Sequence, residues 1–151
     1  MAGIPFTIDT QSVALVASTA KTIGQYVAAT NVRDKISRLD ITVDGVTAAD
    51  PQITVDILVQ TTAGTMTSLT PQKARSSDSE TLQITAQKNA SAEPTPSTIL
   101  FTYFCHPMYG MPPIIFDPPL EIVGGTRIGV RATPGTLTAT THMAVNATGE
   151  E

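Results

Sequence analysis

The side chains best suited to catalysis or metal binding are few and scattered. The chain has two histidines, His106 and His142, and a single cysteine, Cys105. Protein metal sites use three or four ligands at characteristic spacings such as HxH or HExxH, and neither spacing occurs in this sequence. We therefore predict two isolated histidines, no metal and no cofactor.

Cys105 and His106 are neighbours, the residue types of a nucleophile and its general base. Adjacent residues of a strand point to opposite faces, so these two side chains are poorly placed to form a hydrogen bond with each other. We predict that Cys105 is a small buried hydrophobic residue. No catalytic residue is predicted, and we expect a protein that is not an enzyme.

Two loops could bind a phosphate or a cation. The run Gly124-Gly125-Thr126 is too short for a phosphate loop, and no GxGxxG motif occurs, so we predict a turn or bulge there. The loop from Asp44 to Asp50 has the carboxylates for calcium but lacks the DxDxDG pattern. Solvated turn carboxylates are the preferred interpretation, with a calcium site as the alternative.

Composition limits the class of protein. The 151 residues are 41% hydrophobic and 15% charged, with a net charge of −4, which predicts one folded domain and no direct nucleic-acid binding. A single cysteine excludes a disulfide within the chain. No apolar run approaches the roughly 20 residues that span a bilayer, so no membrane contact is expected. Residues 1–11 lack the features of a secretory signal, which predicts a protein that is made and kept in the cytosol or assembled there into something larger.

The residue pattern favours short β-strands. Threonine makes up about a sixth of the chain, and Gly and Pro recur every ten to fifteen residues. Residues 38–43 and 53–59 alternate apolar and polar side chains with a period of two, as in half-buried strands. We predict an all-β, antiparallel β-sandwich that is jelly-roll-like, with eight to ten strands.

The pattern also suggests how the chain is divided. Residues 1–11 form an N-terminal arm or edge strand, residues 12–145 a single β-sandwich domain, and residues 146–151 a polar, frayed tail. Residues 71–96 are the most polar stretch and predict a long surface loop with one weak strand. Pro134-Gly135 predicts a turn that joins the last two strands as a hairpin.

Two apolar stretches are candidate contact surfaces. Residues 98–105 are apolar on both faces, which is typical of a strand in the centre of a sandwich or at a subunit contact. Residues 106–119 contain five prolines, which we expect to prevent regular strand pairing. This loop covers its own sandwich or packs on another subunit, and its Tyr and Met content favours the interface. The candidate interface residues in this loop are Met108, Tyr109, Met111, Ile114, Ile115 and Phe116.

The N-terminal arm is the third candidate. Ile4, Phe6 and Ile8 occupy alternate positions and form one apolar row. An arm of this kind can add a strand to the sheet of a neighbouring subunit. The alternative is a first strand that lies within the sandwich of its own chain.

Several strand-and-turn motifs together resemble the small virion proteins of tailed bacteriophages, in particular head decoration (cement) proteins. The motifs are TAKTI (19–23), RLDITVDG (38–45), VDILV (55–59), EPT (93–95) and GGTRIGVR (124–131). The resemblance implies a structural virion protein that forms a homotrimer, binds the major capsid protein on the outer capsid surface and stabilises the capsid. The alternative function is a trimeric jelly-roll head of a phage fibre or tail that binds a receptor or glycan.

Overall fold

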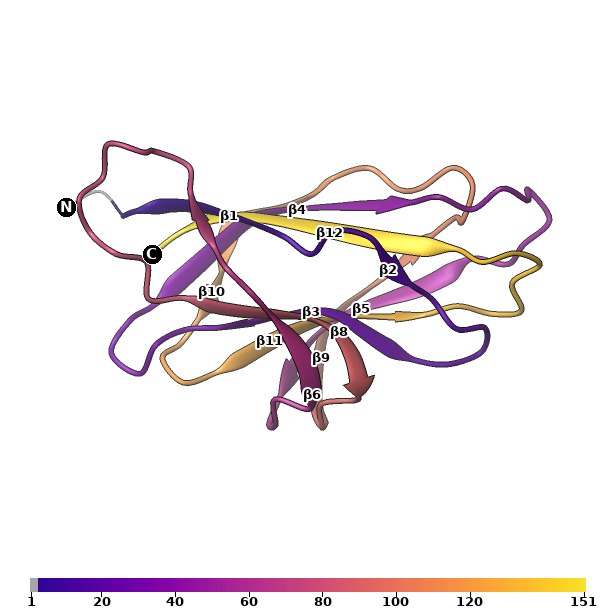
Figure 1. Cartoon of the computed structure of the whole chain (residues 1–151), viewed down its shortest axis with the longest axis horizontal. Coiled ribbons are helices and arrows are strands. Elements are labelled where there is room, and N and C mark those ends of the chain that lie inside the picture. The colour runs from indigo at the N-terminus through magenta and orange to yellow at the C-terminus, as the bar shows by residue number, and fades with distance from the viewer. Residues whose placement is uncertain (1–2) are drawn as a thin grey trace.

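The computed structural model describes residues 3–151, and these residues form two antiparallel six-stranded sheets packed as a sandwich (Figure 1). The predicted all-β sandwich is thereby confirmed. The strands are β1 (Pro5–Asp9), β2 (Val13–Ala14), β3 (Lys21–Val27), β4 (Asp34–Val43), β5 (Ile53–Gln60), β6 (Thr65–Leu69), β7 (Gln72–Lys73), β8 (Thr85–Ala92), β9 (Pro96–Cys105), β10 (Ile114–Ile122), β11 (Arg127–Thr133) and β12 (His142–Glu150). Within the described residues, no helix could cross a membrane.

The strand order is that of a jelly roll. The first sheet runs β10-β4-β12-β1-β7, with β2 added beside β12, and the second runs β6-β8-β3-β11-β5-β9. The antiparallel pairs β1–β12, β3–β11, β4–β10 and β5–β9 join strands progressively closer in sequence, as if one long hairpin were wrapped around the core. The remaining strands, β2, β6, β7 and β8, extend this eight-stranded framework.

Apolar side chains at alternate positions of the strands form the core between the sheets. In β4, Leu39 and Ile41 are buried while Arg38 is exposed, as the period of two predicts. In β5, Ile53, Val55 and Ile57 are fully buried. Strand β5 lies between β11 and β9, so its backbone is hydrogen-bonded on both sides.

Strand β1 belongs to the sandwich of its own chain, which corrects the prediction of a free arm. It pairs with β12 along all five residues and with β7 at two of them. Phe6 and Ile8 are 0% and 1% exposed and pack in the core, while Ile4 is half-buried. The apolar row that suggested an arm in need of a partner is covered by the opposite sheet.

Two predictions for the C-terminal region are wrong. Strands β11 and β12 lie in different sheets, so residues 134–141 cross the sandwich instead of making a hairpin turn. Residues 146–150 belong to β12, and the backbone of Glu151 exchanges two hydrogen bonds with Ile4, of 2.9 and 3.0 Å, so the end of the chain is not frayed. Strand pairing overrides the polar composition of this segment because β12 lies between β1 and β4.

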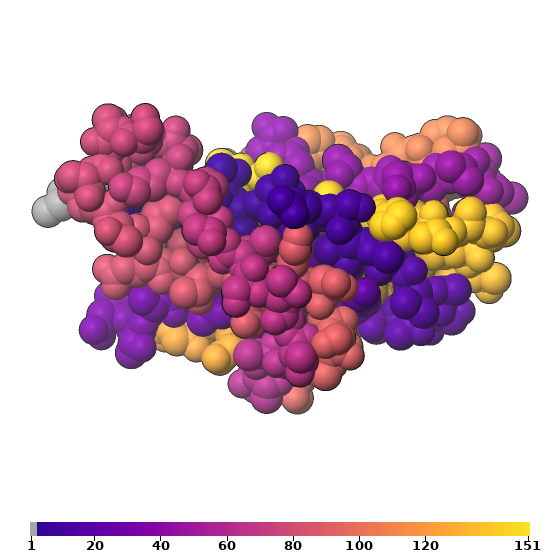
Figure 2. All heavy atoms as spheres, viewed as in Figure 1, coloured from indigo at the N-terminus to yellow at the C-terminus, as the bar shows by residue number. Residues whose placement is uncertain are grey.

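The polar stretch from 71 to 96 contains more strand than predicted, since β7 and the eight-residue β8 both lie within it. The segment between these two strands covers one end of the molecule (Figure 2). At the start of β9 the chain is held by Glu93, whose carboxylate accepts hydrogen bonds of 2.7 Å from the amide and the hydroxyl of Thr22. Gln25 and Gln60, which are buried, extend this polar network: Gln25 donates to Gln60, and Gln60 donates to the hydroxyl of Thr22.

Candidate interaction surface

Strand β9 is the edge strand of its sheet and carries large apolar side chains on both faces. It pairs with β5, and no second strand among residues 3–151 pairs with its other edge. Cys105 points into the core, and alternation places Tyr103 and Phe101 on the same side of the strand. Phe104 points away from the core and is 62% exposed. Residues 98–105 were predicted to lie either in the centre of the sandwich or at a subunit contact. The edge position of β9 shows that the first alternative is wrong.

His106 builds the tight turn that follows β9. His106 and Gly110 form an antiparallel bridge, with hydrogen bonds of 2.8 and 3.3 Å between their backbones. The imidazole Nδ1 accepts hydrogen bonds from the amides of Met108, at 3.1 Å, and Tyr109, at 3.3 Å. Gly110 has a φ of +68°, a left-handed conformation that glycine adopts without strain. The histidine therefore orders a turn that displays Met108 and Tyr109.

Strand β10 faces β9 from the other sheet, of which it is also an edge strand. The rings of Phe101 and Phe116 lie 5.6 Å apart and close the sandwich between the two edges. A groove of about 510 Å³ runs along this side. It is lined by Phe101, Tyr103, Ile115, Phe116, Pro118, Pro119 and Leu120, with Asp117 and Glu121 also along it.

The prolines interrupt the pairing of β10 but do not prevent it. Ile115 pairs with Arg38 of β4, pairing then shifts in register, and it resumes at Leu120. Pro118 and Pro119 lie in the interrupted part, on the free edge of the sheet where no partner needs their missing N–H groups. Within residues 106–119 only Ile114 and Ile115 pair with β4, so the prediction that this stretch forms no regular ladder is wrong for these two residues alone.

The exposed apolar area along this side is large. Its large apolar side chains are between 38% and 72% exposed: Ile99, Leu100, Phe101, Phe104, Met108, Tyr109 and Ile115. At roughly 200 Å² per fully exposed side chain, they present about 750 Å² to solvent. The largest apolar patch on an ordinary monomer is about 300–600 Å², and each partner in a stable complex buries about 800 Å². We call these seven residues, together with the groove, the β9 edge surface.

The β9 edge surface also lacks charge along most of its length. Residues 94–116 contain no Asp, Glu, Lys or Arg. Soluble proteins commonly protect exposed edge strands with charged side chains, which oppose pairing with other chains. The missing charges leave the free edge of β9 open to contact with another protein surface.

The structure separates the predicted interface residues into three groups. Met108, Tyr109 and Ile115 are exposed on the β9 edge surface, and Phe116 lines its groove while being only 8% exposed. Met111 is half-buried and Ile114 is buried, both against the core. Ile4, Phe6 and Ile8 lie in and beside β1, away from this surface. The sequence indicated that residues 98–105 were apolar on both faces, but it did not show which of them stay exposed.

A polar site, separate from the β9 edge surface, was not predicted from the sequence. Asp44 and His142 are 98 residues apart, and Oδ2 of Asp44 lies 2.9 Å from Nδ1 of His142. Partial burial alone would raise the pKa of Asp44, but the hydrogen bonds from the backbone and ring of His142 hold this pKa below its usual value. The pair borders a shallow hollow of about 270 Å³ that is also lined by Ser12 and Thr42. Only the pairing of β12 with β4 and β2 brings these residues together.

The other chemistry-bearing residues have structural partners. Asp50 accepts hydrogen bonds from the amide and hydroxyl of Thr138, so the loop carboxylates are not simply solvated. Cys105 is buried as predicted, and burial raises the pKa of its thiol to about 11. Across residues 3–151, no three His, Cys, Asp or Glu side chains are grouped closely enough to hold a metal ion.

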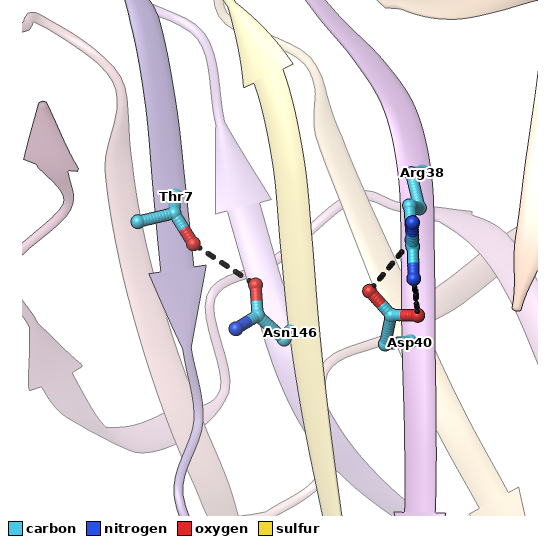
Figure 3. A network of polar contacts seen from close by, with 4 residues as sticks. All are labelled: Thr7, Arg38, Asp40 and Asn146. Carbon is cyan, nitrogen blue, oxygen red and sulfur yellow. Dashed lines mark hydrogen bonds and ion pairs between the residues drawn. The ribbon is translucent and has the colours of Figure 1, made fainter. Parts of the chain in front are cut away.

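The outer face of the first sheet differs from the β9 edge surface because it is polar. Figure 3 shows Thr7 of β1 donating a hydrogen bond of 2.9 Å to Oδ1 of Asn146 in β12. On the neighbouring β4, Arg38 binds both carboxylate oxygens of Asp40 at 2.7 to 3.0 Å. These side chains form hydrogen bonds with one another on the surface, so this face of the first sheet is polar and suited to contact with water.

Comparison of the chain with protein-family models, with curated proteins and with solved structures gives no match. The fold and the surfaces described above are therefore the basis for assigning a function.

Proposed function

We propose that this protein is a structural subunit of a virus particle, a decoration protein that binds the outer surface of a phage capsid and stabilises it. The β9 edge surface is the observation that supports the proposal. It is large, its exposed apolar residues come from a stretch without charged side chains, and its turn is ordered by His106, which are properties of a contact surface. In this proposal the protein acts by contact and not by catalysis, and its partners are copies of itself, as a homotrimer, and the major capsid protein.

The virion assignment draws on two further observations. The motifs at 38–45 and 124–131 resemble those of tailed-phage head proteins, and both lie in and beside strands of the jelly-roll framework, β4 and β11. The jelly roll is also a common architecture of viral capsid proteins, although lectins and cupins share it. The fold therefore agrees with a virion role, while the contact surface is what supports a structural one.

Co-sedimentation tests the proposed function. In a lysate of infected host cells, the protein should sediment with DNA-filled heads and not with free tails. Heads from which it has been removed should release their DNA at a lower temperature than decorated heads, and adding purified protein back should restore the higher temperature. Sedimentation with tails alone would contradict the proposal.

The hollow beside Asp44 and His142 favours a second candidate function, a receptor- or glycan-binding head of a fibre or tail. Its lining offers a carboxylate, an imidazole and two hydroxyl groups, from Ser12 and Thr42, to the hydroxyl groups of a sugar. No aromatic side chain lines this hollow as a stacking platform. Binding to immobilised glycans that is lost in Asp44→Ala, with capsid binding absent, would favour this function over decoration.

A further inference from the structure

The β9 edge surface has two flanks of different shape. The flank facing β10 is concave, because it contains the groove between Phe101 and Pro118. The flank on the outer side of the sheet is convex, because Phe104 projects from it. Beside this ring, Thr102 donates a 2.8 Å hydrogen bond to Asp56, which also pairs with Arg131, so the polar groups nearby are already satisfied.

We propose that a second copy of this chain occupies the groove, with Phe104 of one copy inserted into the groove of the next. This inference rests on the proposed function of a subunit that assembles by contact, and it names the surface and the symmetry. In a head-to-tail ring each copy uses both flanks, so the exposed area of about 750 Å² is divided between two contacts and is buried in full only when the ring closes. Residues 94–116 carry no charged side chain, so Phe104 and its neighbours in β9 bring no charge of their own toward Asp117 and Glu121, the carboxylates along the groove.

The difference between the flanks determines the symmetry. The ring projects from the outer side of the sheet while the groove opens toward β10, so a single two-fold partner cannot fill the groove and cover the ring at the same time. A head-to-tail contact fills each groove with a neighbour's ring and uses both flanks of every copy. Such a contact cannot close with two copies, and the smallest closed ring that it forms is a trimer.

Complementary variants test the head-to-tail contact directly. Phe104→Asp removes the projecting ring but keeps the groove, and Ile115→Asp blocks the groove but keeps the ring. Both sites are exposed, at 62% and 72%, so both variants should fold with wild-type circular dichroism spectra. The wild type should have three times the 15.9 kDa mass of one chain by light scattering, and each variant alone should be monomeric. Val16→Asp, at an exposed valine whose surroundings are near Gly135 and not near the turn after β9, is the control and should stay trimeric.

Mixing the two variants tests the pairing of ring with groove. One intact contact remains between the groove of Phe104→Asp and the ring of Ile115→Asp, so the mixture should form a dimer and stop there. Because the chain has no tryptophan, adding Phe104→Trp to the Ile115→Asp copy provides a single fluorescent probe of this weaker contact. Titration with Phe104→Asp should shift its emission to shorter wavelength as the indole enters the groove.

Three results would overturn the inference. They are a wild-type monomer throughout the micromolar range, variants that keep the wild-type mass, and no emission shift at the highest soluble concentration of the mixture. These measurements use purified protein without capsids. Capsid binding by a monomeric wild type would therefore refute the ring and leave the proposed function standing, whereas a correct ring that binds no capsid would refute only the decoration role.

Discussion

At the scale of single residues, Asp34 links the charge of the protein to its stability. It is fully buried at the start of β4, and no residue from 3 to 151 forms a hydrogen bond with either carboxylate oxygen. Burial, and secondarily the negative charge of Glu151, raise its pKa to about 7. Glu151 is held in place by the amides of Gln83 and Ile84, at 2.7 and 2.9 Å.

The raised pKa predicts a stability that falls as the pH rises. Between the ordinary value of 3.8 and about 7, the folded chain keeps a proton on Asp34 that the unfolded chain has released. Stability from this group is therefore fully present below about pH 4 and is lost as the pH passes through 7. The free energy of unfolding of Asp34→Asn should equal that of the wild type at pH 4. At pH 8 it should exceed the wild-type value by at most about 4 kcal/mol.

Urea unfolding at both pH values measures this difference. Glu80→Gln, at an exposed carboxylate, is the control and should change stability equally at pH 4 and pH 8. The prediction would be contradicted if the wild type were more stable to urea than Asp34→Asn, and by a larger margin at pH 8 than at pH 4. That result would show that the fold stabilises the charged form of the carboxylate.

At the scale of elements, the periodicity of the sequence predicted strands β4 and β5, although only β4 has one buried face and β5 is buried on both faces. It could not predict which strands become neighbours, because pairing between distant segments leaves no local signal. For this reason β12 was expected to pair with β11, although it pairs with β1 and β4. The Asp44–His142 contact was missed for the same reason, since it exists only through the pairing of β12 with β4.

The order of strands in the sheets explains why side chains of β1 are buried while those of β9 are exposed. Both are short apolar runs in the sequence, and either could have been core or surface. The position of β1 beside β12 buries Phe6, whereas the edge position of β9 leaves Phe104 exposed. Exposure was therefore determined by sheet order and not by hydrophobicity.

Deleting residues 1–9 tests the structural role of β1. The deletion removes two fully buried side chains, Phe6 and Ile8, and leaves one edge of β12 unpaired. Each large side chain lost from a core costs about 2–5 kcal/mol, so the truncated protein should not fold at all or should melt at a temperature lower by many degrees. The milder Phe6→Ala should lower the free energy of unfolding by about 3–5 kcal/mol.

Circular dichroism melting curves measure both changes, with Val16→Ala as a surface control at a half-exposed valine. A truncated protein that melts at the wild-type temperature would show that β1 is dispensable for the fold and would restore the free-arm interpretation.

At the scale of the whole molecule, the jelly roll concentrates its exposed apolar residues on one side. Two edge strands from different sheets, β9 and β10, meet there, and the His106 turn joins them. The outer face of the first sheet is polar, with Arg38–Asp40 and Thr7–Asn146 contacts. The molecule therefore has one surface suited to stable contact with another protein and another suited to solvent, as expected for a subunit of an assembly.

Hydrogen exchange by mass spectrometry tests most directly the claim that the β9 edge surface is where the protein makes contact. The purified protein is measured at a concentration that favours assembly and again after dilution, with Phe104→Asp as the comparison. At the higher concentration we expect slower amide exchange in residues 98–104 and 106–116. We expect no effect of concentration in β6 and β7, which lie at the far edges of the two sheets. In Phe104→Asp, concentration should have no effect on exchange anywhere. Protection that appears at β6 or β7 while residues 98–116 exchange at the same rate in both samples would contradict this claim.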